Sequence, residues 1–160
     1  MPEAATDGLT IGFITHFINV HGGKDAFQGL TTREVCWKYV VPYTAAMELS
    51  QVDHVRDHDS NGRTYVKPAA WFVSHAWDYA FLDVVDALDT FLSECQVEDL
   101  DRVAVWFCVF NNNQHEFSYG SHPFEYWFGR FHDALTSIAN VVMVFSPWNH
   151  PTTHAHVVCV

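Results

Sequence analysis

Three short apolar runs, each ending in a polar and aromatic turn, constrain the fold of this chain more than any other feature. They are Ala69–Ser74, Val103–Phe110 and Val141–Phe145. Each is too short for a typical helix and is rich in β-branched or aromatic residues, which favours a buried strand. Pro68 suits the entry to the first strand, because proline fixes φ and has no N–H for a ladder hydrogen bond.

Helical patterns separate these runs. Apolar residues recur at helical spacing from Phe81 to Leu92, with aspartates on the opposite face. A second helix is predicted from His122 to Ile138, with Pro123 acceptable in its first turn. The repeated order of strand, turn and helix predicts an α/β fold with a small, mainly parallel sheet and right-handed crossovers.

Residues 1–66 are predicted to form a helical extension of this sheet. Apolar spacing predicts a helix over Leu9–Val20. A capping box over Thr31–Glu34 is expected to begin a second helix, which Pro42 ends. A third, shorter helix is predicted over Thr44–Val55.

Length, composition and charge bound the class of protein. With 160 residues, 49% of them hydrophobic, residues 1–160 are predicted to be one domain with its α/β core in 67–160. The formal charge of −11 disfavours nucleic acid and anionic membranes as partners. The chain starts without a secretory signal and has no apolar run of membrane-spanning length. We therefore expect a cytoplasmic protein.

The cysteines carry no disulfide or zinc signature. Cys36, Cys95, Cys108 and Cys159 are widely spaced and form no CxxC pair, so we expect buried free thiols. The last residues, Val157–Val160, are apolar and need a partner element. This ending predicts a fold that is truncated at its C-terminus and a native protein that continues beyond it.

Four motifs together resemble one known family. They are Phe72–Trp77, the helix Phe81–Leu88, the stretch from Trp106 to His115, and Val144–Trp148. In this order they are similar to the TIR-like (Toll/interleukin-1 receptor-like) domains of large protist and algal multidomain proteins. The segment Thr31–Asp53 resembles the helical extension that often precedes such domains.

The resemblance implies a flavodoxin-like sheet and one of two activities. TIR domains either assemble into signalling scaffolds or cleave NAD at the nicotinamide ribosyl bond. The expected function is therefore a signalling module that recognises a nucleotide such as NAD, self-associates, or does both. Catalytic relatives carry a glutamate in a Trp-Cys-x-x-Glu segment, whereas this chain ends at Val158-Cys159-Val160 without it. An NAD glycohydrolase is the alternative if that glutamate is supplied elsewhere.

Candidate site residues lie in the turns after the predicted strands. The predicted catalytic residues are His75, His115 and Glu125, and the predicted ligand-binding residues are Ser74, Trp77, Asp78, Asn113, Gln114 and Trp148. The two histidines follow different strands whose carboxyl ends share one edge, so we expect their imidazoles to lie close together. The tryptophans offer stacking surfaces to a base or ribose.

Each of these assignments has a structural alternative. His75 can hydrogen-bond its own turn while the tryptophans fill the core. Asn113 and Gln114 can present amides to ligand hydroxyls, but amide residues also suit any strand exit. Glu125 can act as an acid or base, but a glutamate in the first turn of a helix is also favoured by the helix dipole.

A histidine cluster near the C-terminus gives a third functional class. His150, His154 and His156 form an HxxxHxH pattern that can bind Zn²⁺ through neutral imidazoles, which makes a metal-dependent hydrolase the second alternative. No cysteine or carboxylate stands beside them in ligand register. No cofactor is therefore expected to be required, and NAD is the expected substrate or ligand.

Overall fold

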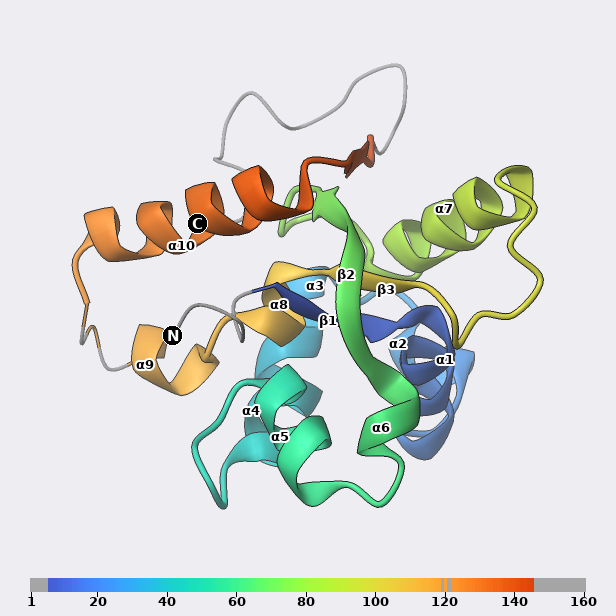
Figure 1. Ribbon diagram of the computed structural model, residues 1–160. Coiled ribbons are helices and arrows are strands. Elements are labelled where there is room, and N and C mark those ends of the chain that lie inside the picture. The colour runs from blue at the N-terminus through green and yellow to red at the C-terminus, as the bar shows by residue number, and fades with distance from the viewer. Residues whose placement is uncertain (1–5, 119, 121, 146–160) are drawn as a thin grey trace.

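The computed structural model describes residues 6–118, 120 and 122–145 (Figure 1). Along these residues the chain forms β1 (Asp7–Thr10), α1 (Ile11–Val20), α2 (Lys24–Phe27), α3 (Thr32–Val35), the π-helical turn η2 (Cys36–Val40), α4 (Val41–Thr44), α5 (Gln51–His58), α6 (Gly62–Tyr65), β2 (Val66–Ser74), α7 (Phe81–Glu94), β3 (Ala104–Trp106), α8 (Cys108–Asn111), α9 (Gln114–Ser118), α10 (Phe124–Ile138) and β4 (Val141–Met143).

A mixed sheet organises the fold. The strand order is β1-β3-β2-β4, and β2 runs parallel to both β3 and β4. β1 is antiparallel to β3 and also pairs with the start of β2. The predicted α/β class with a mainly parallel sheet is therefore confirmed.

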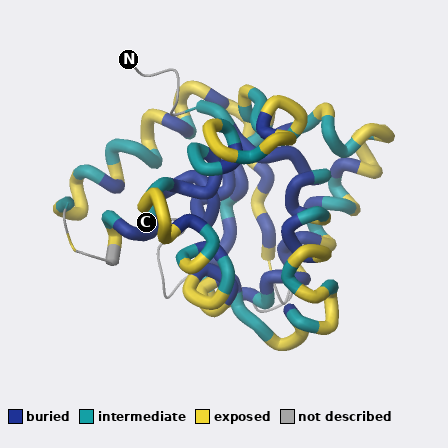
Figure 2. The backbone as a smooth tube through the Cα atoms, turned by 90° about the horizontal axis from the view of Figure 1, so that it is seen from below, coloured by how far each residue is buried: buried dark blue, intermediate teal, exposed yellow. Residues whose placement is uncertain are grey.

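Helices cover both faces of the sheet. Phe72 and Trp106 stack on the α10 face, with ring centroids 4.8 Å apart, and pack with Ala134 and Ile138 of α10. Val73 points the opposite way, into the larger core that α1 and α7 share. β1 and β3 are mostly buried, whereas β2 is buried only at Phe72 and Val73. Figure 2 shows the buried residues gathered inside the molecule and the exposed ones on its outer turns.

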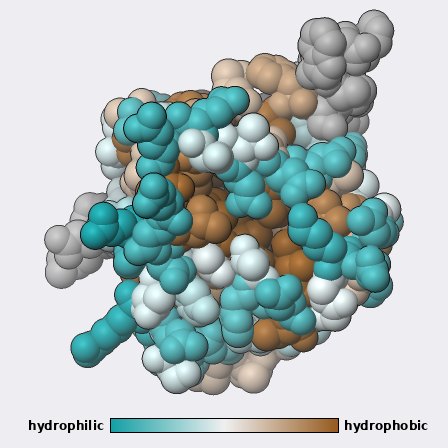
Figure 3. Space-filling view, turned by 90° about the vertical axis from the view of Figure 1, so that its right-hand side faces the viewer, coloured by the Kyte–Doolittle hydropathy of each residue, from teal (hydrophilic) through white to brown (hydrophobic). Residues whose placement is uncertain are grey.

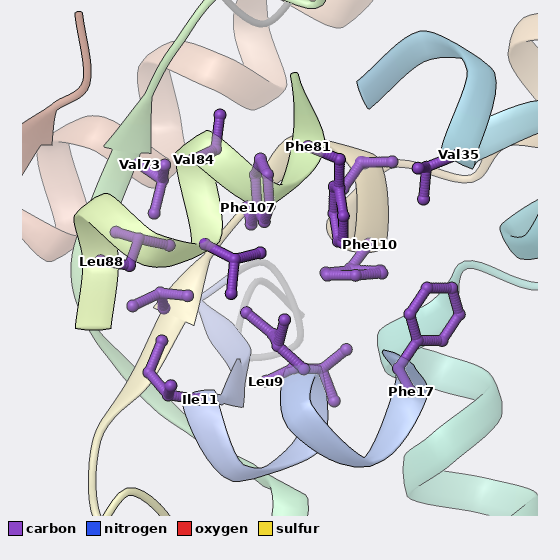
Figure 4. Packing of buried hydrophobic residues seen from close by; sticks show 14 of the residues in the cluster. Leu9, Ile11, Phe17, Val35, Val73, Phe81, Val84, Leu88, Phe107 and Phe110 are labelled. Carbon is purple, nitrogen blue, oxygen red and sulfur yellow. The ribbon is translucent and has the colours of Figure 1, made fainter. Parts of the chain in front are cut away.

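Aromatic side chains fill the larger core. Phe107 and Phe110 follow β3 and meet Phe81 of α7, while Phe17 of α1 approaches Phe110 from below (Figure 4). The rings of Phe107 and Phe110 are nearly perpendicular, with centroids 5.5 Å apart. This edge-to-face arrangement is favourable beyond the apolar area that it buries.

Three predicted elements are confirmed with small changes of boundary. β2 contains the run Ala69–Ser74 but begins at Val66, so Pro68 lies inside it, opposite Asp7. α7 begins at Phe81 as the periodicity predicts. α10 begins after Pro123, which caps it, and ends at Ile138 as predicted.

The first strand was not predicted. Asp7–Thr10 pairs with two strands, so the prediction that a helix begins at Leu9 is wrong. The helix begins at Ile11 instead, where the Thr10 hydroxyl accepts the Phe13 N–H at 3.2 Å. The described part of the N-terminal segment, residues 6–66, is therefore mainly helical, but it also contributes a strand to the sheet. A four-residue strand carries too short a pattern to be recognised from its sequence alone.

Pro42 widens a helix rather than ending it. Proline has no N–H, and just before it the Val41 N–H bonds the Cys36 carbonyl, five residues back, in the π-helical turn. The chain then continues as α4 to Thr44. The prediction that the second helix ends at Pro42 is therefore wrong.

The third N-terminal helix is displaced from its predicted range of Thr44–Val55. Its N-cap is Ser50, whose hydroxyl accepts the Asp53 N–H at 3.1 Å, and α5 runs from Gln51 to His58. A side-chain cap fixes where a helix begins, and apolar spacing alone did not locate this one.

The second predicted strand, Val103–Phe110, is half right. β3 is buried at all three positions, but it ends at Trp106 and the chain turns into α8. The Asn111 side chain explains the break, because its Oδ1 accepts the Phe107 N–H at 3.0 Å and its Nδ2 donates to the Asp7 carbonyl at 2.7 Å. The Phe107 N–H is thus bonded to a side chain instead of the sheet.

The third predicted strand is an edge strand rather than a buried one. β4 pairs with β2, and within the described part of the chain it has no neighbour on its other side. Val142 and Val144 are buried, whereas Val141, Met143 and Phe145 are exposed. The prediction of a strand here is therefore confirmed over Val141–Met143, whereas the prediction that it is buried holds for only one of its faces.

The polar faces of the outer helices are turned to solvent. Figure 3 shows the side of the molecule on which α1 and α7 lie, with hydrophilic residues around a central depression where apolar residues reach the surface.

No helix within the described residues has both the length and the apolar character needed to cross a membrane.

Gly8 is expected to tolerate no side chain. A Cβ added there would run into the Val105 carbonyl on the neighbouring strand, whereas a Cβ at Gly129 in α10 would meet no heavy atom within 4 Å. We expect Gly8→Ala to lower the free energy of unfolding by about 1–3 kcal/mol. Gly129→Ala should raise it by up to about 1 kcal/mol, because alanine favours helix. Urea unfolding of both variants measures the two changes. Equal changes in the free energy of unfolding would contradict the close packing of β1 against β3.

Candidate functional site

The sheet topology places a site between the ends of two strands. From β2 the chain leaves towards α7 on one face, and from β3 it leaves towards α10 on the other. β2 and β3 are neighbouring parallel strands, so their carboxyl ends lie at one edge of the sheet, outside which open α/β sheets bind ligands. The turn that begins at His75 follows β2, and Phe107 follows β3.

His75 links the two strand ends from the inside. Its side chain is wholly buried, and its ring meets the Phe107 ring edge to face with centroids 4.8 Å apart. The Trp77 ring lies 6.2 Å away. His75 therefore supports the turn after β2 from the core side.

His115 lies in different surroundings from His75. Its Nε2 is 2.8 Å from the Thr44 hydroxyl, and its backbone N–H donates to Asn113 Oδ1 at 3.0 Å. Because the Thr44 hydroxyl also donates to the Val40 carbonyl at 2.9 Å, its single proton is engaged, and His115 Nε2 acts as the donor. His115 thus ties the second turn to the N-terminal helices, and none of its described contacts involves His75.

The Trp77 side chain is half-buried in the turn after β2. The Arg33 guanidinium lies 6.0 Å from the centre of its ring, and Arg33 also pairs with Asp78 at 3.3 Å. The indole Nε1 is buried and has no hydrogen-bond partner among the described residues. Trp77 therefore combines an aromatic surface with an unused donor.

The segment Thr31–Glu34, which forms the capping box, holds the turn after β2 in place. The Thr32 N–H donates to the Tyr79 carbonyl at 3.0 Å, and the Arg33 N–H donates to the Trp77 carbonyl at 3.1 Å. The predicted capping box is confirmed, with Thr31 and Glu34 bonding each other's backbone N–H groups. Two segments that lie 45 residues apart in sequence thus form one wall of the site.

The predicted amide ligands bond the protein's own backbone. Asn113 Nδ2 donates to the Glu48 carbonyl at 2.8 Å. Gln114 Nε2 donates to the carbonyls of Cys108 and Val109 at 3.2 and 3.3 Å. The Asn113 bond holds the loop before α5 against the turn after α8, and the Gln114 bonds hold the start of α9 against α8.

The two remaining candidates among the described residues, Ser74 and Glu125, lie at the end of a strand and at the start of a helix. Ser74 is the last residue of β2, and its carbonyl accepts the Val144 N–H at 2.8 Å. Glu125 is exposed in the first turn of α10, where the helix dipole favours a carboxylate. Their roles in binding or catalysis stay predictions.

The thiols divide into two environments. Cys36 and Cys108 are buried as expected, whereas Cys95 is exposed, so the expectation of a buried thiol is wrong there. Burial raises the pKa of the Cys36 thiol to about 12, against a smaller lowering by Arg33. At neutral pH the Cys36 sulfur is therefore protonated and unsuited to nucleophilic chemistry.

No metal centre forms among residues 6–118, 120 and 122–145, since no three His, Cys, Asp or Glu side chains there are grouped to hold an ion. Four predicted site residues lie outside the described residues: Trp148, His150, His154 and His156.

Comparison with family models, curated proteins and solved structures found no match. Sequence reasoning found His75, Trp77 and Asp78 but missed Thr32, Arg33 and Tyr79. The available signal was the capping box, which predicts a well-ordered helix start but does not say what that start packs against.

A second group of buried polar side chains was also missed. Gln51 is wholly buried at the start of α5, and neither of its amide atoms has a hydrogen-bond partner within the described part of the chain. α5 packs against α8, and Asn112 directly follows α8. The buried Oδ1 of Asn112 also has no hydrogen-bond partner among the described residues. Buried polar side chains of this kind cannot be recognised from the alternating or helical spacing of apolar residues in the sequence.

Proposed function

We propose that this protein is a TIR-like signalling module, built on a flavodoxin-like sheet, that recognises a nucleotide such as NAD at the carboxyl ends of β2 and β3. The observation that carries the proposal is Trp77, which follows β2 with a half-buried ring beside the Arg33 guanidinium and with an unused, buried N–H. Few side chains other than tryptophan offer both a stacking surface and a donor.

Each neighbour of Trp77 has a distinct part in this proposal. The Trp77 ring stacks on the base or the nicotinamide, as aromatic side chains do with nucleotides. Arg33, held by Asp78 at 3.3 Å, places a positive charge beside that ring for the phosphates. His75 is wholly buried against Phe107 and is a positioning residue that sets the angle of the turn.

The arrangement favours binding over turnover. The described carboxylate that adjoins Trp77 in sequence is Asp78, which is already paired with Arg33. Glu125 is exposed at the start of α10. Binding is therefore the primary proposal, and NAD cleavage is an outcome that the same experiment detects.

Calorimetric titration with NAD tests the proposal. We expect saturable binding that Trp77→Ala weakens roughly 5- to 100-fold, because stacking of a base on an aromatic side chain contributes about 1–3 kcal/mol. Trp37→Ala is the matched control, since Trp37 is 48% exposed on η2, outside the site. Absence of binding, or equal weakening by both variants, would refute the assignment.

A nicotinamide-release assay on the same samples separates a binding module from an enzyme. The binding proposal predicts no release above a protein-free blank. Release by the wild type that is lost in His75→Ala would instead make this chain an NAD glycohydrolase.

Self-association is a second proposed function, favoured by the exposed side of β4. Val141 pairs with Phe72, so Val141, Met143 and Phe145 point to the α10 face, yet all three are exposed. β4 carries no charged residue. The electrostatic repulsion between two copies that arises from the net charge of −11 is therefore weakest along this edge. An uncharged edge strand with exposed apolar side chains is suited to pairing with another strand.

Sedimentation velocity over a range of protein concentrations tests the self-association. We expect concentration-dependent association that Met143→Glu abolishes, because the new carboxylate would have to be buried in the contact. Met47→Glu introduces the same charge at a methionine of similar exposure, 53% against 60%, and should leave association intact. A wild type that stays monomeric throughout would rule out this function.

A further inference from the structure

Three buried donors gather where the capping-box segment meets the turn after β2. They are the hydroxyls of Thr32 and Tyr79 and the indole N–H of Trp77. Both hydroxyl-bearing side chains are almost wholly buried. None of the three polar atoms has a hydrogen-bond partner among the described residues, although buried polar groups nearly always have one.

A backbone contact between the two segments brings together the residues that carry two of these donors. Thr31 and Ala80 form an isolated antiparallel bridge, and beside it the Thr32 N–H donates to the Tyr79 carbonyl at 3.0 Å. Arg33 and Asp78 form their ion pair on the outside, with both side chains exposed. The side chains of Thr32 and Tyr79 are buried, so both lie on the inner side of this contact.

Trp77 adds the third donor to this inner face. Its carbonyl accepts the Arg33 N–H at 3.1 Å, which holds it against the same segment, and its indole N–H is turned away from solvent. An indole N–H can only donate, and each hydroxyl can also donate. A group that satisfies all three must present acceptors.

We infer that these three side chains bind a phosphoryl group, whose oxygens accept hydrogen bonds from Thr32, Trp77 and Tyr79. The Arg33 guanidinium beside the Trp77 ring adds the charge that such an anion favours. The inference rests on the proposed function, because it assigns the phosphate of the same nucleotide whose base stacks on Trp77. It adds a chemical selectivity that stacking alone does not provide.

Titration with AMP and with adenosine tests the inference. The wild type should bind AMP at least about tenfold more tightly than adenosine, which is 1.4 kcal/mol. In the double variant Thr32→Val, Tyr79→Phe, the two affinities should become equal, while adenosine binds as in the wild type. If inorganic phosphate displaces AMP from the wild type but not from the double variant, the ligand of these three side chains is free phosphate. If AMP binds and inorganic phosphate does not displace it, the ligand is the nucleotide.

Two outcomes would overturn the inference. One is equal binding of AMP and adenosine by the wild type; if Trp77→Ala weakens both, the proposed function survives and only the phosphoryl assignment fails. Binding of neither ligand, nor of NAD, would defeat both. The second outcome comes from urea unfolding without ligand, where each single variant should be at least as stable as the wild type. Loss of stability in both would show that the hydroxyls are bonded inside the fold.

Discussion

Replacing Asn111 with alanine is expected to lower the free energy of unfolding by about 2–4 kcal/mol, because a buried polar group left without a partner costs about 1–3 kcal/mol. The Asn111 amide bonds the Phe107 N–H at 3.0 Å and the Asp7 carbonyl at 2.7 Å. It therefore holds the exit of β3 to the start of β1. Urea or guanidinium unfolding of the variant measures the loss.

Asn113→Ala is the matched control for this change. Asn113 Nδ2 donates to the exposed Glu48 carbonyl and its Oδ1 accepts the His115 N–H, but neither bond joins two strands, so its loss should cost less, about 0.5–1.5 kcal/mol. Similar effects of the two substitutions would show that Asn111 does not hold the two strands together.

Replacing Phe107 with alanine is expected to destabilise the fold by about 3–5 kcal/mol, through lost burial and the cavity that remains. The Phe107 side chain is wholly buried, stacks with Phe81 and meets the edges of His75 and Phe110. The same change should also loosen the turn after β2, because His75 loses the ring that supports it.

Phe124→Ala removes an identical side chain from the surface. Phe124 is 57% exposed on α10, so we expect a change of no more than about 0.5 kcal/mol. Thermal or denaturant unfolding of both variants provides the comparison. A loss below about 1 kcal/mol for Phe107→Ala would contradict the packing described for the core.

The elements predicted correctly are those with strong local patterns. α7 and α10 carry helical periodicity over fourteen and fifteen residues, and a capping box marks the start of α3. The apolar run before Ser74 lies within β2 as expected. In each case the residues that define the element are neighbours in the sequence.

The elements predicted wrongly depend on distant partners. β1 is a strand because β2 and β3 offer it hydrogen bonds, and β3 ends early because Asn111 captures the Phe107 N–H. Likewise, β4 is apolar at every position, but the described chain covers only one of its faces. Apolar composition indicates that a strand can be buried, and the fold decides which faces are covered.

The candidate site divides in the same way. The turn with His75 and Trp77 was predicted from its place after a strand, and the structure places it at the carboxyl end of β2. Its partners Thr32 and Arg33 come from a segment some 45 residues earlier in the chain. Single-sequence reasoning has no means of pairing such segments, because the pairing is a property of the tertiary structure.

The indole N–H signal of Trp77 during titration with NAD tests the central claim most directly. The chain has six tryptophans, so a ¹H–¹⁵N correlation spectrum shows at most six indole signals, and Trp77→Phe and Trp37→Phe assign the two that matter. We predict that the Trp77 signal moves progressively and saturably with NAD, while the Trp37 signal stays in place. A Trp77 signal that does not move at saturating NAD, or one that moves no more than that of Trp37, would contradict the claim.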